Sequence, residues 1–297
     1  MNFTEQANPP SPSASPGEER AARPGLSRPL LSGILVLAFL FVLMPFLFWR
    51  ATWFGQPLGD DEITRYLGDR EHPRKAQHAL SEISRRLSGD SSGRASVRRW
   101  YPEVIALASS EHAELRLTAA WVMGQDNSSG DFRVALQRLL VDPNPMVRRN
   151  AALSLVRFRD AQGHDEIHAM LDPYIEKAGV QGTLRERLRP GDSVNPGTLL
   201  ARIESGRDTI EVRTQVPGTL ERWLVADNSG VAPGTAIAAI APSPEELWEG
   251  LRALFLIGQK SDLALVENLA GSRAGVPEYI RKQAELTARA IRNRNPQ

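Results

Sequence analysis

Residues 182–203 read GTLRERLRPGDSVNPGTLLARI, and residues 218–240 read GTLERWLVADNSGVAPGTAIAAI. The two stretches align at an offset of 36 residues, which becomes 37 after one inserted residue near Asn228. Both begin with Gly-Thr-Leu, both contain a Pro-Gly-Thr turn, and both end on an isoleucine, Ile203 and Ile240. Short apolar stretches separated by glycine turns are typical of β-strands, so the sequence predicts a small all-β unit built from two equivalent halves.

This internal repeat resembles the biotinyl/lipoyl-like barrel-sandwich hybrid, and the resemblance covers residues 180–242. In that family a lysine at the hairpin tip between the halves receives biotin or lipoate. Here residues 204–209 form the tip, and counting back from Gly218 puts Arg207 at the position of the lysine. A guanidinium stays protonated in proteins and is no acyl-acceptor amine. The resemblance therefore implies a module that carries no cofactor, with Arg207 and Asp208 at its tip as candidate contacts for a partner.

An uncharged stretch over residues 30–49 predicts a membrane-spanning helix. It reads LLSGILVLAFLFVLMPFLFW, and about 20 helical residues span a hydrocarbon core of roughly 30 Å. We expect a single-pass helix over residues 29–50, preceded by a disordered tail over residues 1–28 that is rich in proline and serine. More arginines precede the stretch than follow it closely, so the positive-inside rule predicts a bacterial inner-membrane protein with a cytoplasmic N-terminus and extracytoplasmic C-terminal domains.

Amphipathic helical patterns dominate the rest of the chain, over residues 61–177 and again over residues 245–293. Two of these helices share a phrase at an offset of 32 residues: Leu-Arg at 115–116 and Val-Arg at 147–148 are each followed by an alanine pair. The phrase resembles the short bacterial form of the HEAT repeat, a family of stacked helix pairs with an extended concave face. The expected fold class is therefore mainly α: a single transmembrane helix, then a HEAT-like α-solenoid interrupted by the small all-β barrel-sandwich hybrid.

Few residues point to catalysis. The chain has no cysteine and a net charge of +1, so neither thiol chemistry nor a nucleic-acid partner is expected. His164 and His168 stand one helical turn apart, a spacing that can bind a metal ion, but no third ligand is close in sequence and a polar helix face is the simpler interpretation. Trp121 is expected in the core. Trp223 is at an outward strand position, where it either contacts a partner or packs against the solenoid.

These patterns together predict a membrane-anchored, non-enzymatic scaffold that docks proteins of an envelope complex. One alternative is an adaptor related to the membrane-fusion proteins of efflux and secretion systems, although those proteins insert a long helical hairpin where this chain has six residues. Another alternative, from a different functional class, is a metal-dependent hydrolase that uses His164 and His168.

Overall fold

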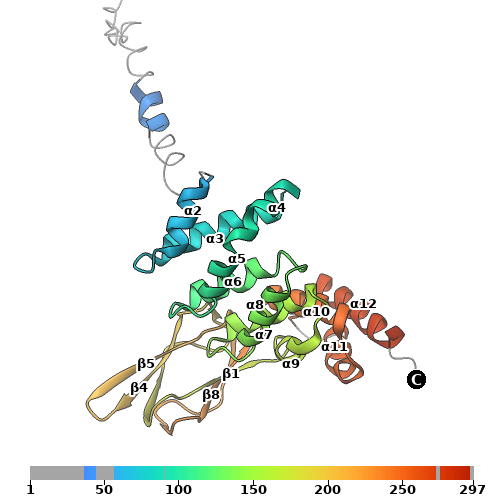
Figure 1. Cartoon of the computed structure of the whole chain (residues 1–297). Coiled ribbons are helices and arrows are strands. Elements are labelled where there is room, and N and C mark those ends of the chain that lie inside the picture. The colour runs from blue at the N-terminus through green and yellow to red at the C-terminus, as the bar shows by residue number, and fades with distance from the viewer. Residues whose placement is uncertain (1–36, 45–56, 90, 272–274, 295–297) are drawn as a thin grey trace, which may run out of the picture. The chain divides into compact units, whose positions relative to one another are not determined.

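The structure, a computed structural model, describes residues 37–44, 57–89, 91–271 and 275–294. Residues 37–44 form a helix, and a separate compact unit begins at Pro57. In that unit helices come first along the chain, strands follow, and helices return at the end (Figure 1). The β-strands are therefore an insertion between two helical segments.

Of the predicted membrane span, the structure describes residues 37–44, which are helical. Across all the described residues, no helix combines the length and the apolar character that a membrane crossing requires. On this finding the predicted single-pass helix is wrong, together with the inner-membrane location and the topology derived from it. Residues 29–36 and 45–50 of the predicted span, and the predicted tail over 1–28, lie outside the described residues.

Helices of the compact unit pair along the chain, and the second helix of each pair packs against the second helix of the next. In the part of the chain that the structure describes, the pairs are α2 (Asp60–Gly68) with α3 (Pro73–Leu87), α5 (Tyr101–Leu107) with α6 (Ala113–Met123), α7 (Gly130–Leu139) with α8 (Pro145–Arg157), α9 (His164–Ala169) with α10 (Pro244–Ile257), and α11 (Leu263–Ala270) with α12 (Glu278–Arg294). A shorter helix, α4 (Ser91–Val97), follows α3. Contacts run from α3 through α6, α8 and α10 to α12, so the second helices form one continuous layer.

Two arginines at equivalent positions of the helical phrase fix the register of neighbouring pairs. Arg116 in α6 donates from Nε to Asp142 Oδ2 at 2.6 Å, and Nη1 donates to the carbonyl of Ser110. Arg148 in α8 donates from Nε to Glu166 Oε2 at 2.9 Å, and Nη1 donates to the carbonyl of Asp142. Each arginine thus joins its own helix pair to a carboxylate of the next pair, which explains why both copies of the phrase contain it.

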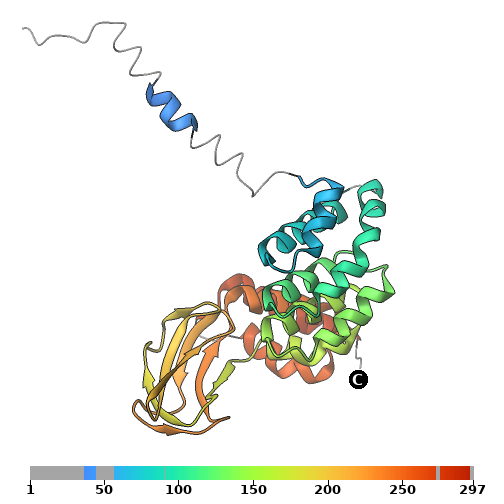
Figure 2. The same ribbon diagram turned by 60° about the vertical axis from the view of Figure 1, so that its left-hand side comes forward.

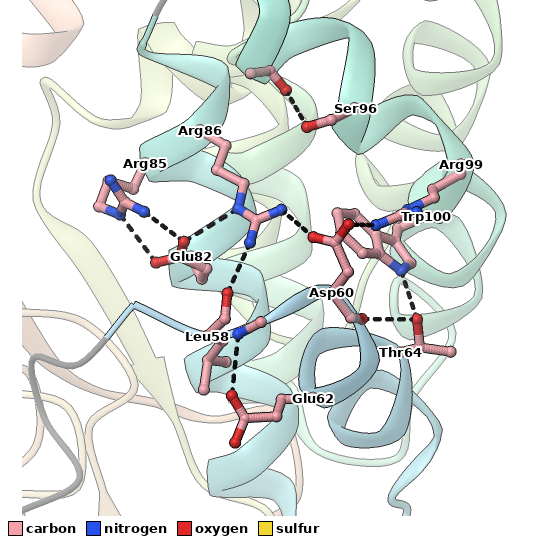
Figure 3. Close-up of polar contacts among 12 residues, drawn as sticks. Leu58, Asp60, Glu62, Thr64, Glu82, Arg85, Arg86, Ser96, Arg99 and Trp100 are labelled. Atoms are coloured by element: carbon pink, nitrogen blue, oxygen red, sulfur yellow. Dashed lines mark hydrogen bonds and ion pairs between the residues drawn. The ribbon is translucent and has the colours of Figure 1, made fainter.

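A network of charged side chains joins the first helices of the compact unit (Figure 3). Arg86 donates to Asp60 Oδ1 at 2.6 Å and to the buried Glu82 at 3.1 Å. Arg99 also pairs with Asp60, and its guanidinium lies over the Trp100 ring at 4.2 Å from the ring centre. Since these ions are matched with one another, the network stabilises the first helices.

The strands form what we call the β module, residues 174–241, which separates α9 from its partner α10. In chain order they are β1 (Tyr174–Lys177), β2 (Gly182–Glu186), β3 (Ser193–Val194), β4 (Leu199–Ser205), β5 (Asp208–Arg213), β6 (Gly218–Trp223), β7 (Gly230–Val231) and β8 (Ala236–Ala241). As far as the chain is described, they make two four-stranded antiparallel sheets, ordered β1-β8-β6-β3 and β5-β4-β2-β7. Figure 2 shows the strands gathered beside the helices.

The two copies of the sequence repeat occupy equivalent places, and each sheet takes strands from both copies. The short β3 of the first copy pairs with β6 of the second, and β7 of the second copy pairs with β2 of the first. A Cβ atom on Gly182 would collide with the carbonyl oxygen of Glu204, and one on Gly218 with the carbonyl oxygen of Ala241. Close backbone packing therefore requires the glycine of both Gly-Thr-Leu phrases.

Candidate functional site

The hairpin of β4 and β5 carries the two residues that the sequence identifies as contacts for a partner. The strands stay paired up to Ser205 and Asp208, so Gly206 and Arg207 alone make the connection, and the turn is shorter than the six residues expected over 204–209. Gly206 has a φ of +63°, as the first central residue of a type II′ turn requires. Arg207 and Asp208 are exposed, and the hairpin extends away from the helices (Figure 1).

The tip of the hairpin contains no lysine. Lysines occur in the chain at Lys75, Lys177, Lys260 and Lys282, and none of them is in β4, β5 or the turn between them. Arg207, in the turn, has a permanently charged and weakly nucleophilic side chain. The tip therefore exposes one cation, Arg207, and one anion, Asp208, to solvent.

Trp223, at the end of β6, is half-buried within the β module. Its Nε1 donates a hydrogen bond to the carbonyl of Leu188 at 3.2 Å, and its ring packs against both apolar clusters of the module. One of these clusters also includes Met146 of α8 and Tyr174 of β1, so it lies where the module meets the helices. Packing inside the module accounts for this tryptophan, and its contact with a partner stays a prediction.

His164 and His168 meet at a carboxylate that is distant in sequence. Asp262 ends the short 3-10 turn η3 (Lys260–Asp262) and is fully buried. His164 Nε2 lies 2.9 Å from Asp262 Oδ2, and His168 Nδ1 lies 2.8 Å from Asp262 Oδ1. Among the residues whose placement is described, no three or more His, Cys, Asp or Glu side chains are arranged to hold a metal ion. The pair of imidazoles instead fastens α9 to the start of α11, and we call this contact the His–Asp clamp.

The electrostatics of the His–Asp clamp favour an imidazolium beside a carboxylate. Burial lowers the pKa of His164, but hydrogen bonds with Asp262 and Asp165 outweigh it, so the pKa lies above its ordinary value. Burial raises the pKa of Asp262, but hydrogen bonds from His164, the Gln259 backbone and His168 outweigh it, so the pKa lies below its ordinary value. The two pKa shifts widen the pH range in which the His164 imidazole is protonated while the Asp262 carboxylate is ionised.

A buried ion pair lies where the β module joins the helices. Arg149 of α8 donates to Glu246 of α10, and both side chains are buried. Arg149 Nε is 3.8 Å from Glu166 Oε1 of α9, and the guanidinium is 5.9 Å from the centre of the Tyr174 ring in β1. One guanidinium therefore contacts the helix before the β module, the first strand and the helix after it. We call this end of the module, with Arg149, Glu246 and Tyr174, the root.

Two carboxyl groups near the root are hard to ionise. Burial raises the pKa of Glu246, and Arg149 offsets that effect only in part. Burial raises the pKa of Glu176 in β1 to about 7, and its Oε2 has no hydrogen-bond partner among the described residues. The charge of Glu176, beside the root, therefore changes near neutral pH.

A groove with a volume of about 740 Å³ lies on the layer of second helices, bounded by α6, α8, α10 and α12. Its lining includes Trp121, Leu153, Phe255, Leu256 and Leu286, with Glu249, Arg157 and Arg252 among its polar residues. Trp121 is 45% exposed, so the prediction that it packs in the core is wrong. The buried face of α6 is made instead by smaller residues, among them Ala119, Ala120 and Val122.

Comparison with known proteins finds two similarities. Residues 101–174 match HEAT repeats, a segment that runs from α5 to the first residue of β1. This match confirms the HEAT-like character of that part of the chain. It stops where the β module begins, and α10, which pairs with α9, lies beyond the insertion.

The second similarity is to the dihydrolipoyllysine-residue acetyltransferase component of the pyruvate dehydrogenase complex from Rickettsia bellii (strain RML369-C). The two sequences are 24% identical over 125 residues, which is 42% of this chain and 30% of that protein. The chain thus matches less than a third of the length of this relative. It is similar in sequence to HEAT repeats in one segment and, weakly, to a protein whose name specifies a lipoylated lysine.

Proposed function

We propose that this chain is a non-enzymatic scaffold that docks protein partners through its helical repeats and through the tip of its β module. The HEAT-like segment supports the first part, because stacked helix pairs of this kind present extended surfaces to partners. The observation that carries the proposal is the contrast within the β module. Arg149 fastens the root to α8, α9 and α10, whereas Arg207 and Asp208 at the tip are exposed to solvent.

We further propose that the β module is a lipoyl-like barrel-sandwich hybrid that keeps the shape of a carrier and carries nothing. Its two equivalent halves, the exposed hairpin and the similarity to a protein named for dihydrolipoyllysine support this. That name also describes a component of a multi-protein complex, which fits a docking role. The two-residue connection at Gly206 and Arg207 favours this proposal over the efflux-type adaptor, which inserts a long helical hairpin at the same place.

Affinity capture of the full-length chain from its own cells, followed by cross-linking and mass spectrometry, tests the proposal. We expect a reproducible protein partner, cross-linked to residues of the tip or of the second-helix layer. The intact mass of the captured chain should contain no added group on residues 174–241. A mass increment located in the β module, or a chain that is reproducibly captured without any partner, would overturn the proposal.

A further inference from the structure

Exposed apolar side chains gather in the groove between α6, α8, α10 and α12. Trp121 comes from α6, Phe255 and Leu256 from α10, and Leu286 from α12, and all four are exposed in spite of their size. Single exposed apolar residues are normal on a protein surface, whereas a cluster drawn from several elements around one groove marks an interaction site. Tryptophan, which has the largest apolar surface, is also enriched among the residues that dominate binding energy.

The rim of this groove has an excess of positive charge. Arg157 Nη1 donates to the carbonyl of Gly124 at 3.1 Å and to Gln125 Oε1 at 2.9 Å, which orients the guanidinium. Within the described residues Arg157 has no carboxylate partner in an ion pair. Arg252 lies over the Trp248 ring, at 6.0 Å from the ring centre, and its ion pair with Glu249 is long, at 3.9 Å. Two guanidinium groups and one carboxylate therefore border the groove, so a partner with a carboxylate is complementary in charge.

The walls of the groove restrict the backbone conformation of a partner. All four bounding elements are α-helices, whose backbone N–H and C=O groups bond within each helix. An extended peptide gains affinity by adding a strand to a free sheet edge, and the groove offers no such edge among its described lining residues. A helical partner satisfies its own backbone and needs only side-chain contacts. The groove is therefore suited to a helix that presents an apolar stripe.

We propose that this groove binds an amphipathic helix of a partner protein, with the apolar stripe against Trp121, Leu256 and Leu286 and a carboxylate directed to Arg157. This inference rests on the proposed scaffold function and names the class of partner for the helical layer. The volume of about 740 Å³ is in the range of pockets that enclose a compact ligand, which is enough for the side chains of one helix face.

The probe for the test is a displayed library of peptides of about 15 residues, or four helical turns, with leucine fixed at helical spacing and the other positions randomised. The library is selected against the full-length chain, and we expect the selected peptides to be enriched in Asp and Glu over Lys and Arg. Fluorescence anisotropy with a labelled selected peptide then gives the affinity. Leu286→Glu and Arg157→Glu should each weaken binding of an acidic peptide at least tenfold. Arg157→Glu should also reverse the preference in favour of a Lys-substituted peptide.

Matched variants separate the groove from the rest of the surface. Val141→Glu makes the same kind of change at an exposed apolar residue outside the groove lining, and it should leave the affinity unchanged. Thermal unfolding should be close to that of the wild type for all three variants, because the altered side chains are exposed. Selected peptides without acidic enrichment, a library without any binder, or an affinity that Leu286→Glu and Arg157→Glu do not change would each overturn the inference.

Partner capture distinguishes this inference from the proposed function. If the groove variants retain the captured partner and lose no peptide affinity, the helical groove is not the site, while the scaffold function stands. If the wild-type chain binds acidic helical peptides but is captured without any protein partner, the scaffold proposal fails and the groove remains a binding site for helices.

Discussion

The root and the tip of the β module are equivalent positions in the fold with opposite surroundings. In one sheet Ile203 pairs with Ile210 next to the tip, and in the other sheet Ile240 pairs with Tyr174 at the root. These pairs correspond under the offset of the sequence repeat. Beyond the first pair the chain closes in a two-residue turn, and beyond the second it continues into α9 and α10.

The difference between the two ends is one of burial. At the root Arg149 and Glu246 are removed from water, which is favourable only while both charges are present and matched. At the tip Arg207 and Asp208 remain hydrated, and no buried group depends on them. The two ends of the β module therefore differ although the fold is symmetric: the root is packed against the helices, and the tip is exposed to solvent.

Arg149→Ala should have the largest effect, because it breaks the root. Removal of the guanidinium leaves Glu246 buried without its counter-ion, which lowers the free energy of unfolding by about 3–5 kcal/mol. Urea denaturation of the full-length chain measures this loss. The double variant Arg149→Met with Glu246→Leu should recover most of it, since no buried charge remains.

An arginine on the module surface provides the control for the root. Arg222 of β6 is exposed and pairs only with its neighbour Glu221 in the described residues, so Arg222→Ala should change the free energy of unfolding by less than about 0.5 kcal/mol. If Arg149→Ala lowered the free energy of unfolding as little as Arg222→Ala does, the stability of the root would not depend on its ion pair. The root and the tip would then not differ in their contribution to stability.

The next largest effect is expected from Asp262→Asn in the His–Asp clamp beside the root. The amide cannot accept charged hydrogen bonds from both imidazoles, so the free energy of unfolding should fall by about 2–3 kcal/mol in urea titrations. Asp165→Asn is the matched control, because Asp165 also contacts His164 but is fully exposed. It should cost less than about 0.5 kcal/mol, and a similar loss for both variants would argue against a special role for the buried carboxylate.

The same clamp predicts a pH dependence with two limits. The pKa of Asp262 lies below its ordinary value of 3.8, so the stability from this group is present above that value and is lost as pH falls through the lowered pKa. The pKa of His164 lies above its ordinary value of 6.5, so its contribution is complete below that value and is lost as pH rises through the raised pKa. Asp262→Asn should therefore cost most between these limits.

Glu176→Gln tests the buried carboxyl group beside the root, because the substitution should raise the stability of the chain only at high pH. Burial raises the pKa of Glu176 from 4.5 to about 7, so the folded state loses stability as pH rises from the ordinary value through the raised one. The neutral amide removes this penalty, with a gain of about 1–2 kcal/mol at about pH 8 and almost none at about pH 4. Thermal unfolding across this range tests it, and Lys177→Gln, an exposed neighbour in β1, should keep the wild-type pH dependence.

Local constraints explain what the sequence could predict. Gly182 and Gly218 are required by close backbone packing, and Arg116 and Arg148 repeat because each contacts the next helix pair, so both repeats are visible without any structure. Asp262 could not be found in this way, because it is more than 90 residues from the histidines that it contacts. The same holds for Arg149 and Glu246, which are 97 residues apart.

Exposure is also hard to predict from periodicity. The helical pattern around Trp121 indicates which residues share a face of α6, but it does not show whether another helix covers that face, and the tryptophan is exposed. Hydropathy likewise measures only how apolar residues 30–49 are, and no helix among the described residues is long and apolar enough to cross a membrane.

The smallest effect on stability is expected at the tip, from Arg207→Glu combined with Asp208→Arg. Both side chains are exposed and Gly206 keeps its turn conformation, so thermal unfolding should change by less than about 0.5 kcal/mol. Partner capture should respond very differently if the tip docks, because mismatched charges at an interface commonly cost about 2 kcal/mol or more. We therefore expect the tip charges to affect partner capture and not stability, whereas Arg149 at the root affects stability. Unchanged capture by the charge-reversed chain would instead assign docking to the helical groove alone.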